Sequence, residues 1–131
     1  MIKFTVLGDP VAQARPRATR FGNGVRLYDP KKIRDFKTYF KFCAAEAMKG
    51  GAPLDVPLIV TLDVYVQRPK SWPKKRVHAD RAPDLDNFAK GSLDAMQGVV
   101  YTNDSRIVVL HLEKHLSDIP RCEVRVEPVD K

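Results

Sequence analysis

Cysteine is scarce in this sequence, and long apolar runs are missing. The two cysteines, Cys43 and Cys122, cannot form a disulfide framework or a zinc site by themselves. No apolar run approaches the roughly 18 residues of a membrane span, and the amino terminus turns polar too soon for a secretory signal. Glycine-rich phosphate loops, nucleophile elbows and cysteine–histidine pairings are also lacking. We therefore expect a protein of the reducing cytosol, with no membrane partner and no nucleotide cofactor.

What is present is typical of a small globular protein. The chain has 131 residues, of which 44% are hydrophobic and 30% are charged. This composition argues against intrinsic disorder, and the length predicts one domain over residues 1–131. A chain of this size buries enough surface to fold without staples.

The positive charge is concentrated in two blocks. Residues 1–41 carry ten basic and three acidic side chains, and residues 68–81 carry six and one, whereas the rest of the chain is mildly acidic. The formal net charge is +7. Basic blocks of this kind attract polyanions, and nucleic acid is the commonest polyanion in a cytosol. The alternative is a basic surface without a partner.

Apolar periodicity predicts an α/β (α+β) fold in the order β-α-β-α-β-β, with a mixed sheet packed by two helices. Alternation of apolar and polar residues predicts the strands. The first helix is predicted from its start signal, Asp29-Pro30, and from the helical spacing of the apolar residues that follow. The expected strands are residues 2–7, 57–67, 106–115 and 121–127, and the expected helices are residues 30–49 and 84–97.

Two basic connections separate these elements. Residues 8–29 contain prolines, glycines and arginines, which predicts a long loop or a hairpin around the sequence FGNG. The prolines and basic residues of segment 68–83 predict an exposed loop with Trp72 near its middle. The indole could stack on an unpaired base, or it could fold back onto the core.

Acidic residues form the most informative pattern. Asp84 and Asp86 lie two apart where an extended segment meets a helix, so their side chains are expected to point the same way and to repel each other unless a cation lies between them. Oxygen ligands suit Mg²⁺, and Asp104, in a turn before a strand, offers a third ligand. Mg²⁺ held in this way polarises a phosphoryl oxygen and makes hydroxide available. Lys90, four residues after Asp86, would stabilise the developing charge.

Structural roles remain open for the same residues. Asp86 could be a helix N-cap, and Lys90 could form an ion pair with Asp86 or Asp94. Asp94 itself favours a structural role. His111 and His115 lie four apart in an expected strand, which separates them by roughly 13 Å and prevents them from sharing one metal.

The run PDLDNFAKGSLDAM, followed by YTNDSRI, resembles the RusA family of Holliday junction resolvases. The segments GDPVAQARPR and YDPKK are similar to the phage and prophage branch of that family. The resemblance implies a homodimeric, Mg²⁺-dependent endonuclease of the bacterial host cytosol (Mn²⁺ may replace the metal), which nicks four-way DNA junctions symmetrically near the crossover in recombination and repair. Its essential carboxylates match Asp84, Asp86 and Asp104, and its important lysine matches Lys90.

The resemblance also implies a basic surface that faces the junction. That surface would comprise Arg15, Arg17, Lys74, Lys75, Arg76 and Arg81. A two-fold axis would place two identical sites on two equivalent strands. Two other functions stay open: a non-catalytic protein that binds junctions or other DNA, and a nuclease for other branched nucleic acids such as flaps and forks, or for RNA.

Overall fold

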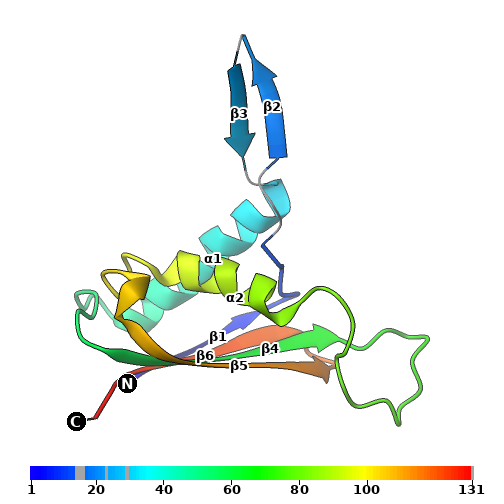
Figure 1. The fold of residues 1–131 in the computed structure, drawn as a ribbon. Helices are drawn as coiled ribbons and strands as arrows, with labels where there is room; N and C mark the ends of the chain where they lie inside the picture. Colours follow the sequence, from blue (N-terminus) through cyan, green and yellow to red (C-terminus); the bar gives the residue numbers. More distant parts are fainter. Residues whose placement is uncertain (14–16, 23, 29, 131) are drawn as a thin grey trace.

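The structure of the protein is a computed structural model that describes residues 1–13, 17–22, 24–28 and 30–130, with the side chains of 17–21 and 25–28 left out. A four-stranded sheet carries both helices on one face, and a two-stranded hairpin stands apart from it (Figure 1). The elements are β1 (Ile2–Leu7), β2 (Arg17–Phe21), β3 (Gly24–Tyr28), α1 (Lys31–Met48), β4 (Leu58–Gln67), α2 (Leu85–Met96), the 3₁₀ turn η1 (Asp104–Arg106), β5 (Ile107–Ser117) and β6 (Arg121–Pro128).

The main sheet is mixed, as predicted. Its strand order is β1-β6-β4-β5, with β4 and β5 parallel and the other two pairs antiparallel. Parallel neighbours need a crossover connection, and here the basic loop 68–83 and α2 provide it. The connection therefore fixes α2 on the same side of the sheet as α1.

Alternation along the central strand decides which face is buried. On β4, Leu58, Val60, Leu62 and Val64 are fully buried beneath the helices, whereas the residues between them lie on the open face of the sheet. The predicted inward residues of β6 are also buried. From α1, Phe40 reaches this core and packs its ring edge against Phe4 of β1, with the ring centroids 5.7 Å apart.

The two helices approach each other closely at a glycine. A Cβ atom built on Gly91 of α2 would lie 3.2 Å from Cδ1 of Ile33 in α1, so even an added methyl group would require the Ile33 side chain to shift by a few tenths of an ångström. Near the far end of α2, Lys37 of α1 forms an ion pair with Asp94, Nζ to Oδ2, at 3.2 Å. These contacts fix the position of α2 against α1.

The segment 8–29 contains a hairpin, one of the two forms predicted for it. β2 and β3 pair antiparallel from Arg17 opposite Tyr28 to Phe21 opposite Gly24. Gly22 begins the turn at φ +58°, a left-handed conformation that favours glycine. The hairpin projects away from the sheet beside the first turn of α1 (Figure 1).

Both helices lie within one residue of their predicted bounds. Pro30 occupies the N-cap position of α1, and the predicted cap Asp29 lies outside the described residues. Lys49, at φ +52°, ends α1 just before the predicted glycine pair. Among the helices described, none is both long enough and apolar enough to cross a membrane.

Candidate active site

The first turn of α2 presents two of the predicted metal ligands and the predicted lysine to solvent. Asp84 occupies the N-cap position in an extended conformation, and its carbonyl accepts the N–H groups of Asn87 and Phe88 at 3.1 and 3.4 Å. Because Phe88 packs into the core, the opposite side of the helix faces outward. Asp84, Asp86 and Lys90 are all exposed there.

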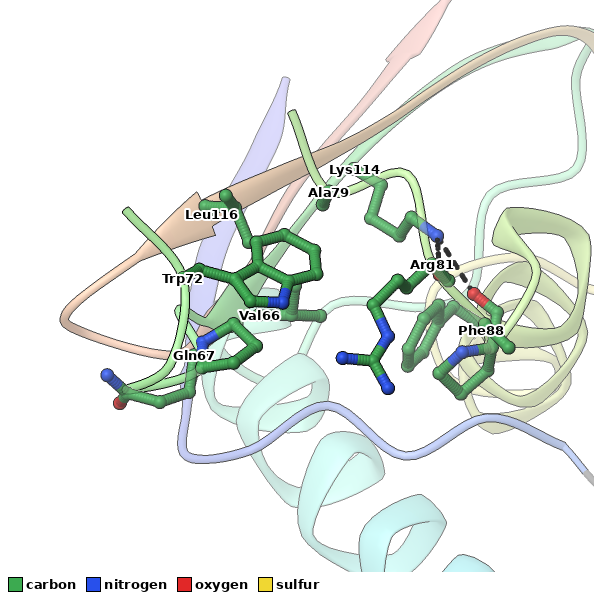
Figure 2. Close-up of a pocket in the computed structure, with 11 residues that line it drawn as sticks. Val66, Gln67, Trp72, Ala79, Arg81, Phe88, Lys114 and Leu116 are labelled. Atoms are coloured by element: carbon green, nitrogen blue, oxygen red, sulfur yellow. Dashed lines mark hydrogen bonds between the residues drawn. The ribbon is translucent and has the colours of Figure 1, made fainter. Parts of the chain in front are cut away.

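Lys114 holds the backbone that leads into this turn. Its Nζ donates hydrogen bonds to the carbonyl oxygens of Arg81, at 2.7 Å, and Pro83, at 2.9 Å (Figure 2). Lys114 belongs to β5, on the face of the sheet beneath α2. A rigid strand therefore positions the residue immediately before Asp84, whatever the rest of the basic loop does.

The predicted site residues of this turn make no polar contact with other side chains in the described part of the chain. Within the described residues, Asp84, Asp86 and Lys90 make no side-chain hydrogen bond or ion pair. Asp86 lies inside the first turn and not at the N-cap, and Lys90 forms no pair with Asp86 or Asp94. The structural alternatives for these residues thus find no contact to support them.

Asp94 differs from these residues. Its carboxylate is engaged by Lys37 of α1, as described above. The predicted structural role of Asp94 agrees with this contact between the helices.

Asp104 lies at the other end of α2. Its backbone N–H donates to Oε1 of Gln97, the residue that follows the helix, at 3.1 Å. The Tyr101 hydroxyl donates to the carbonyl of Leu93 at 2.5 Å and fastens this turn to the last helical residues. Burial raises the pKa of Tyr101, and the negative charges of Asp104 and Asp94 raise it further. The charge of Asp104 is therefore felt at the carboxyl end of α2.

Asp55 ties down the turn that carries Asp104. Its Oδ1 accepts hydrogen bonds from Oγ1 of Thr102 at 2.7 Å and from Nε of Arg106 at 2.8 Å. The hydrogen bond from Thr102 lowers the pKa of Asp55 most. The hydrogen bond from Arg106 and the positive charge of Arg106 lower this pKa further. Asp55 thus links the segment before β4 to both sides of η1.

The three predicted carboxylates do not converge within one chain. Asp84 and Asp86 lie at the start of α2, Asp104 lies at its end, and twelve helical residues span about 18 Å. Figure 1 shows η1 and the start of α2 at opposite ends of the helix. Among the described residues, these three are not a group with all ligand atoms within 4.8 Å of one another.

A different group of three potential metal ligands lies close together on the open face of the sheet. Asp63, Glu113 and His115 place one ligand atom each within 4.8 Å of the others. His115 Nε2 lies 3.1 Å from Asp63 Oδ1 and 3.7 Å from Glu113 Oε1, and its ring stacks on Tyr65 at 4.8 Å. The pairing of histidine with carboxylate accounts for the arrangement without a metal.

Sequence reasoning missed this group because it compared histidines along one strand. The relevant signal is the register between strands, in which Asp63 lies opposite Glu113 and Tyr65 lies opposite His115. Alternation on β4 could have placed Asp63 on the open face, but not its partner on β5. The group lies on the side of the sheet opposite α2, away from the candidate active site.

The basic loop 68–83 folds back against the sheet at Trp72. The indole is half-buried beside Val66 and Leu116, which agrees with the second of the two roles predicted for it. Arg76 stacks on the indole, with Cζ 3.6 Å from the ring centroid, and pairs with Asp80 at 3.0 Å. That contact lowers the pKa of Asp80.

The other predicted DNA contacts differ in how they are placed. Lys74 and Lys75 are exposed, and within the described residues their side chains have no partner. Arg81 is exposed at the end of the loop, immediately before the start of α2. Arg15 lies outside the described residues, and Arg17 begins β2 with its side chain undescribed.

Comparison with known proteins covers nearly the whole chain. A family model described as Endodeoxyribonuclease RusA matches residues 8–127. The chain is also 36% identical over 138 residues to the uncharacterized protein YqaN of Bacillus subtilis (strain 168), with 98% of this chain and 96% of that protein covered. The family match includes the hairpin, both helices and β4, β5 and all but the last residue of β6, and the match to YqaN covers 98% of the chain.

Proposed function

Because this chain belongs to the RusA endodeoxyribonuclease family, we propose that it is a Mg²⁺-dependent nuclease that resolves four-way DNA junctions. In this proposal it makes paired, symmetric nicks near the crossover during recombination and repair, in the cytosol of a bacterial host. The observation that carries the proposal is the first turn of α2. It exposes two carboxylates and a lysine without partners, directly after a strongly basic loop.

The chemistry of the first turn suits a hard divalent cation. Asp84 and Asp86 offer only oxygen ligands, and both are exposed with no competing hydrogen bond in the described part of the chain. Carboxylate oxygens together with water and phosphate oxygens are what Mg²⁺ prefers, and Mn²⁺ accepts similar ligands. When bound, the metal polarises the scissile phosphate and lowers the pKa of a bound water.

The chain's own residues then have distinct roles. Asp84 and Asp86 orient the cation at the start of α2. Lys90, one turn further along, donates to the oxygen on which negative charge develops. Because Lys90 has no carboxylate partner in the described structure, its charge is available to the phosphate.

The position of Asp104 gives the proposed homodimer a chemical reason. One chain places this carboxylate at the far end of α2, so we propose that a second copy supplies it to the Asp84–Asp86 pair. A two-fold axis would then generate two equivalent sites, each built from both chains. Two sites match the two strands that a junction resolvase must cut.

The basic residues are proposed to hold the sugar-phosphate backbone. Lys74, Lys75, Arg76 and Arg81 belong to the basic loop 68–83 that leads into the candidate active site, and Arg17 begins β2. Arg15, which lies outside the described residues, is included because of the family resemblance. Contacts of this kind set position and affinity, whereas base contacts set sequence preference. Binding is accordingly expected to fall steeply with salt.

A nicking assay tests this function. The purified chain is incubated with a synthetic four-way junction, a linear duplex, a flap and a replication fork at equal salt, with and without Mg²⁺. Symmetric nicks near the crossover that require the metal are expected. Equal or faster cutting of flaps or forks would assign the chain to other branched DNA. Tight junction binding without cutting in Mg²⁺ or Mn²⁺ would indicate a non-catalytic binding protein.

A further inference from the structure

A pocket of about 270 Å³ lies between the basic loop and the start of α2. Figure 2 shows Trp72 on one side and Phe88 on the other, with the Arg81 guanidinium between them at the opening. Val66 and Leu116, from the ends of β4 and β5, lie beside the indole. The pocket thus combines aromatic and aliphatic walls with a cation.

The size and chemistry of this pocket fit a small flat ring. Its volume is just below the roughly 300 Å³ at which pockets for drug-sized ligands begin. The charged side chains that line it are Arg81 and Lys114, and no acidic side chain contributes to the lining. Apolar walls with cations at the rim suit an uncharged ring that is attached to a phosphate.

The pocket adjoins the candidate active site through the backbone. Pro83 lines the pocket, and Asp84 follows it directly. Lys114 contributes to the lining and also holds the carbonyls of Arg81 and Pro83. A group bound in the pocket would therefore lie at a defined place relative to the phosphate that reaches Asp84.

We propose that this pocket receives one unstacked nucleobase of the DNA strand that is cut, and that it thereby selects the cleavage step. The half-buried Trp72 provides a surface on which any base can stack, and the core residue Phe88, which is 3% exposed, closes the inner wall of the pocket. Arg81 has five N–H donors, so besides the backbone contact proposed above it can offer planar donors to acceptor atoms at the base edge. Bases at the crossover of a four-way junction are the easiest to unstack, because unstacking costs least where pairing is already disturbed. The inference rests on the proposed function, for which it supplies the sequence preference.

The tryptophan content allows a direct measurement. Trp72 is the only tryptophan of the chain, so intrinsic fluorescence reports on this pocket alone. A four-way junction with intact bases is expected to quench the emission in metal-free buffer. The same junction is then prepared with a single abasic site, moved one nucleotide at a time through the crossover. One position should reduce the quenching markedly, and the positions around it should not.

Two variants separate base recognition from packing. Trp72→Leu removes the ring, and Trp72→Phe keeps an aromatic surface. Affinity of Trp72→Leu for single-stranded DNA should fall about 5- to 160-fold, the range that corresponds to one lost base–aromatic stack. Its cutting of a mobile junction should spread over many sequence steps, whereas Trp72→Phe should keep the wild-type preference. Tyr39→Leu, which changes an exposed aromatic of α1, serves as the matched control.

The outcomes distinguish this inference from the function on which it rests. Quenching that is insensitive to every abasic position would overturn the pocket proposal, even if Trp72→Leu failed to fold. Unchanged step preference in Trp72→Leu would overturn it as well, with the nuclease function intact. Absence of cutting by the wild-type chain on every branched DNA would overturn the nuclease function, whereas abasic-sensitive quenching would still support a base pocket.

Discussion

The two ends of α2 treat their charged residues in opposite ways. At the start of the helix, Asp84, Asp86 and Lys90 are exposed and have no side-chain partners within the described structure. At its end, Asp94 is paired with Lys37, and the turn that carries Asp104 is fastened through Asp55. The first end thus leaves its charges open to solvent and to ligands, whereas the second end ties its charges to other parts of the chain.

This difference is consistent with the roles proposed for the two ends. Two carboxylates close in sequence repel each other, and no contact within the described residues offsets that repulsion at Asp84 and Asp86. A ligand that arrives from outside the chain can offset it. The other end holds its carboxylate on a fixed turn, as a group presented to a partner would be held.

The sharpest way to break the comparison is to neutralise one aspartate at each end. Asp84→Asn is expected to lower junction cleavage by at least about 100-fold, because it removes one of the two carboxylates proposed to hold the metal ion. Junction binding should stay equal or strengthen, since a charge that repels phosphate is gone. Asp94→Asn should change the cleavage rate only a few-fold. Gel assays measure junction binding and nicking. An equal loss of cleavage in Asp84→Asn and Asp94→Asn would contradict the proposed difference between the two ends of α2.

A second test asks whether the two ends meet across two chains. Asp84→Asn and Asp104→Asn chains are co-expressed with different affinity tags, and the mixed dimers are isolated. Each mixed dimer would hold one intact site and one doubly defective site. We therefore expect recovery of metal-dependent cutting, with single nicks in place of paired ones.

The matched control for that test combines two changes at the same end of the helix. Mixed dimers of Asp84→Asn and Asp86→Asn retain no intact site in any arrangement, so they should stay inactive. If Asp84→Asn with Asp104→Asn is equally inactive, Asp104 acts within its own chain. Dimers of Asp104→Asn alone should be inactive, and cutting by them would show that Asp104 has no role.

The smallest expected effect concerns the fastening of Asp104. The hydrogen bonds from Thr102 and Arg106 lower the pKa of Asp55, so its stabilising contribution is full above the unfolded pKa near 3.9. The contribution is lost as the pH falls through the lowered value. Asp55→Asn should therefore reduce the melting temperature slightly at pH 7, and this difference should shrink as the pH falls through the lowered pKa.

Activity gives a second measure of the same variant. Asp55→Asn should slow cutting by a few-fold with junction affinity unchanged, because it loosens the turn that presents Asp104. A melting difference that persists at low pH would show that the Asp55 charge is not what matters.

Local sequence patterns predicted the elements well because each element is dictated locally. Alternation on β4 identified its buried residues, and the spacing of Phe88 and its neighbours identified the inner face of α2. The hairpin was one of two forms left open for residues 8–29. Those predictions needed only the spacing of apolar residues along the chain and the turn preferences of glycine and proline.

The site was harder to predict because its distances are not local. Carboxylates grouped by sequence proximity turned out to lie at opposite ends of α2, since the chain folds back only after the helix has ended. The Asp63–His115 contact depends on strand register, which no single strand reveals. The pocket at Trp72 depends on how an irregular loop packs.

The hydrogen bonds of Lys114 bear on how the sequence of the basic loop can vary. Because a strand holds the carbonyls of Arg81 and Pro83, the last residues of the basic loop keep their place independently of those before them. Insertions or exchanges between Arg68 and Asp80 can alter which DNA the loop grips while the start of α2 stays where it is. If the proposed function holds, the loop can be exchanged between relatives while the proposed active site stays in place, which offers a route to nucleases of new preference.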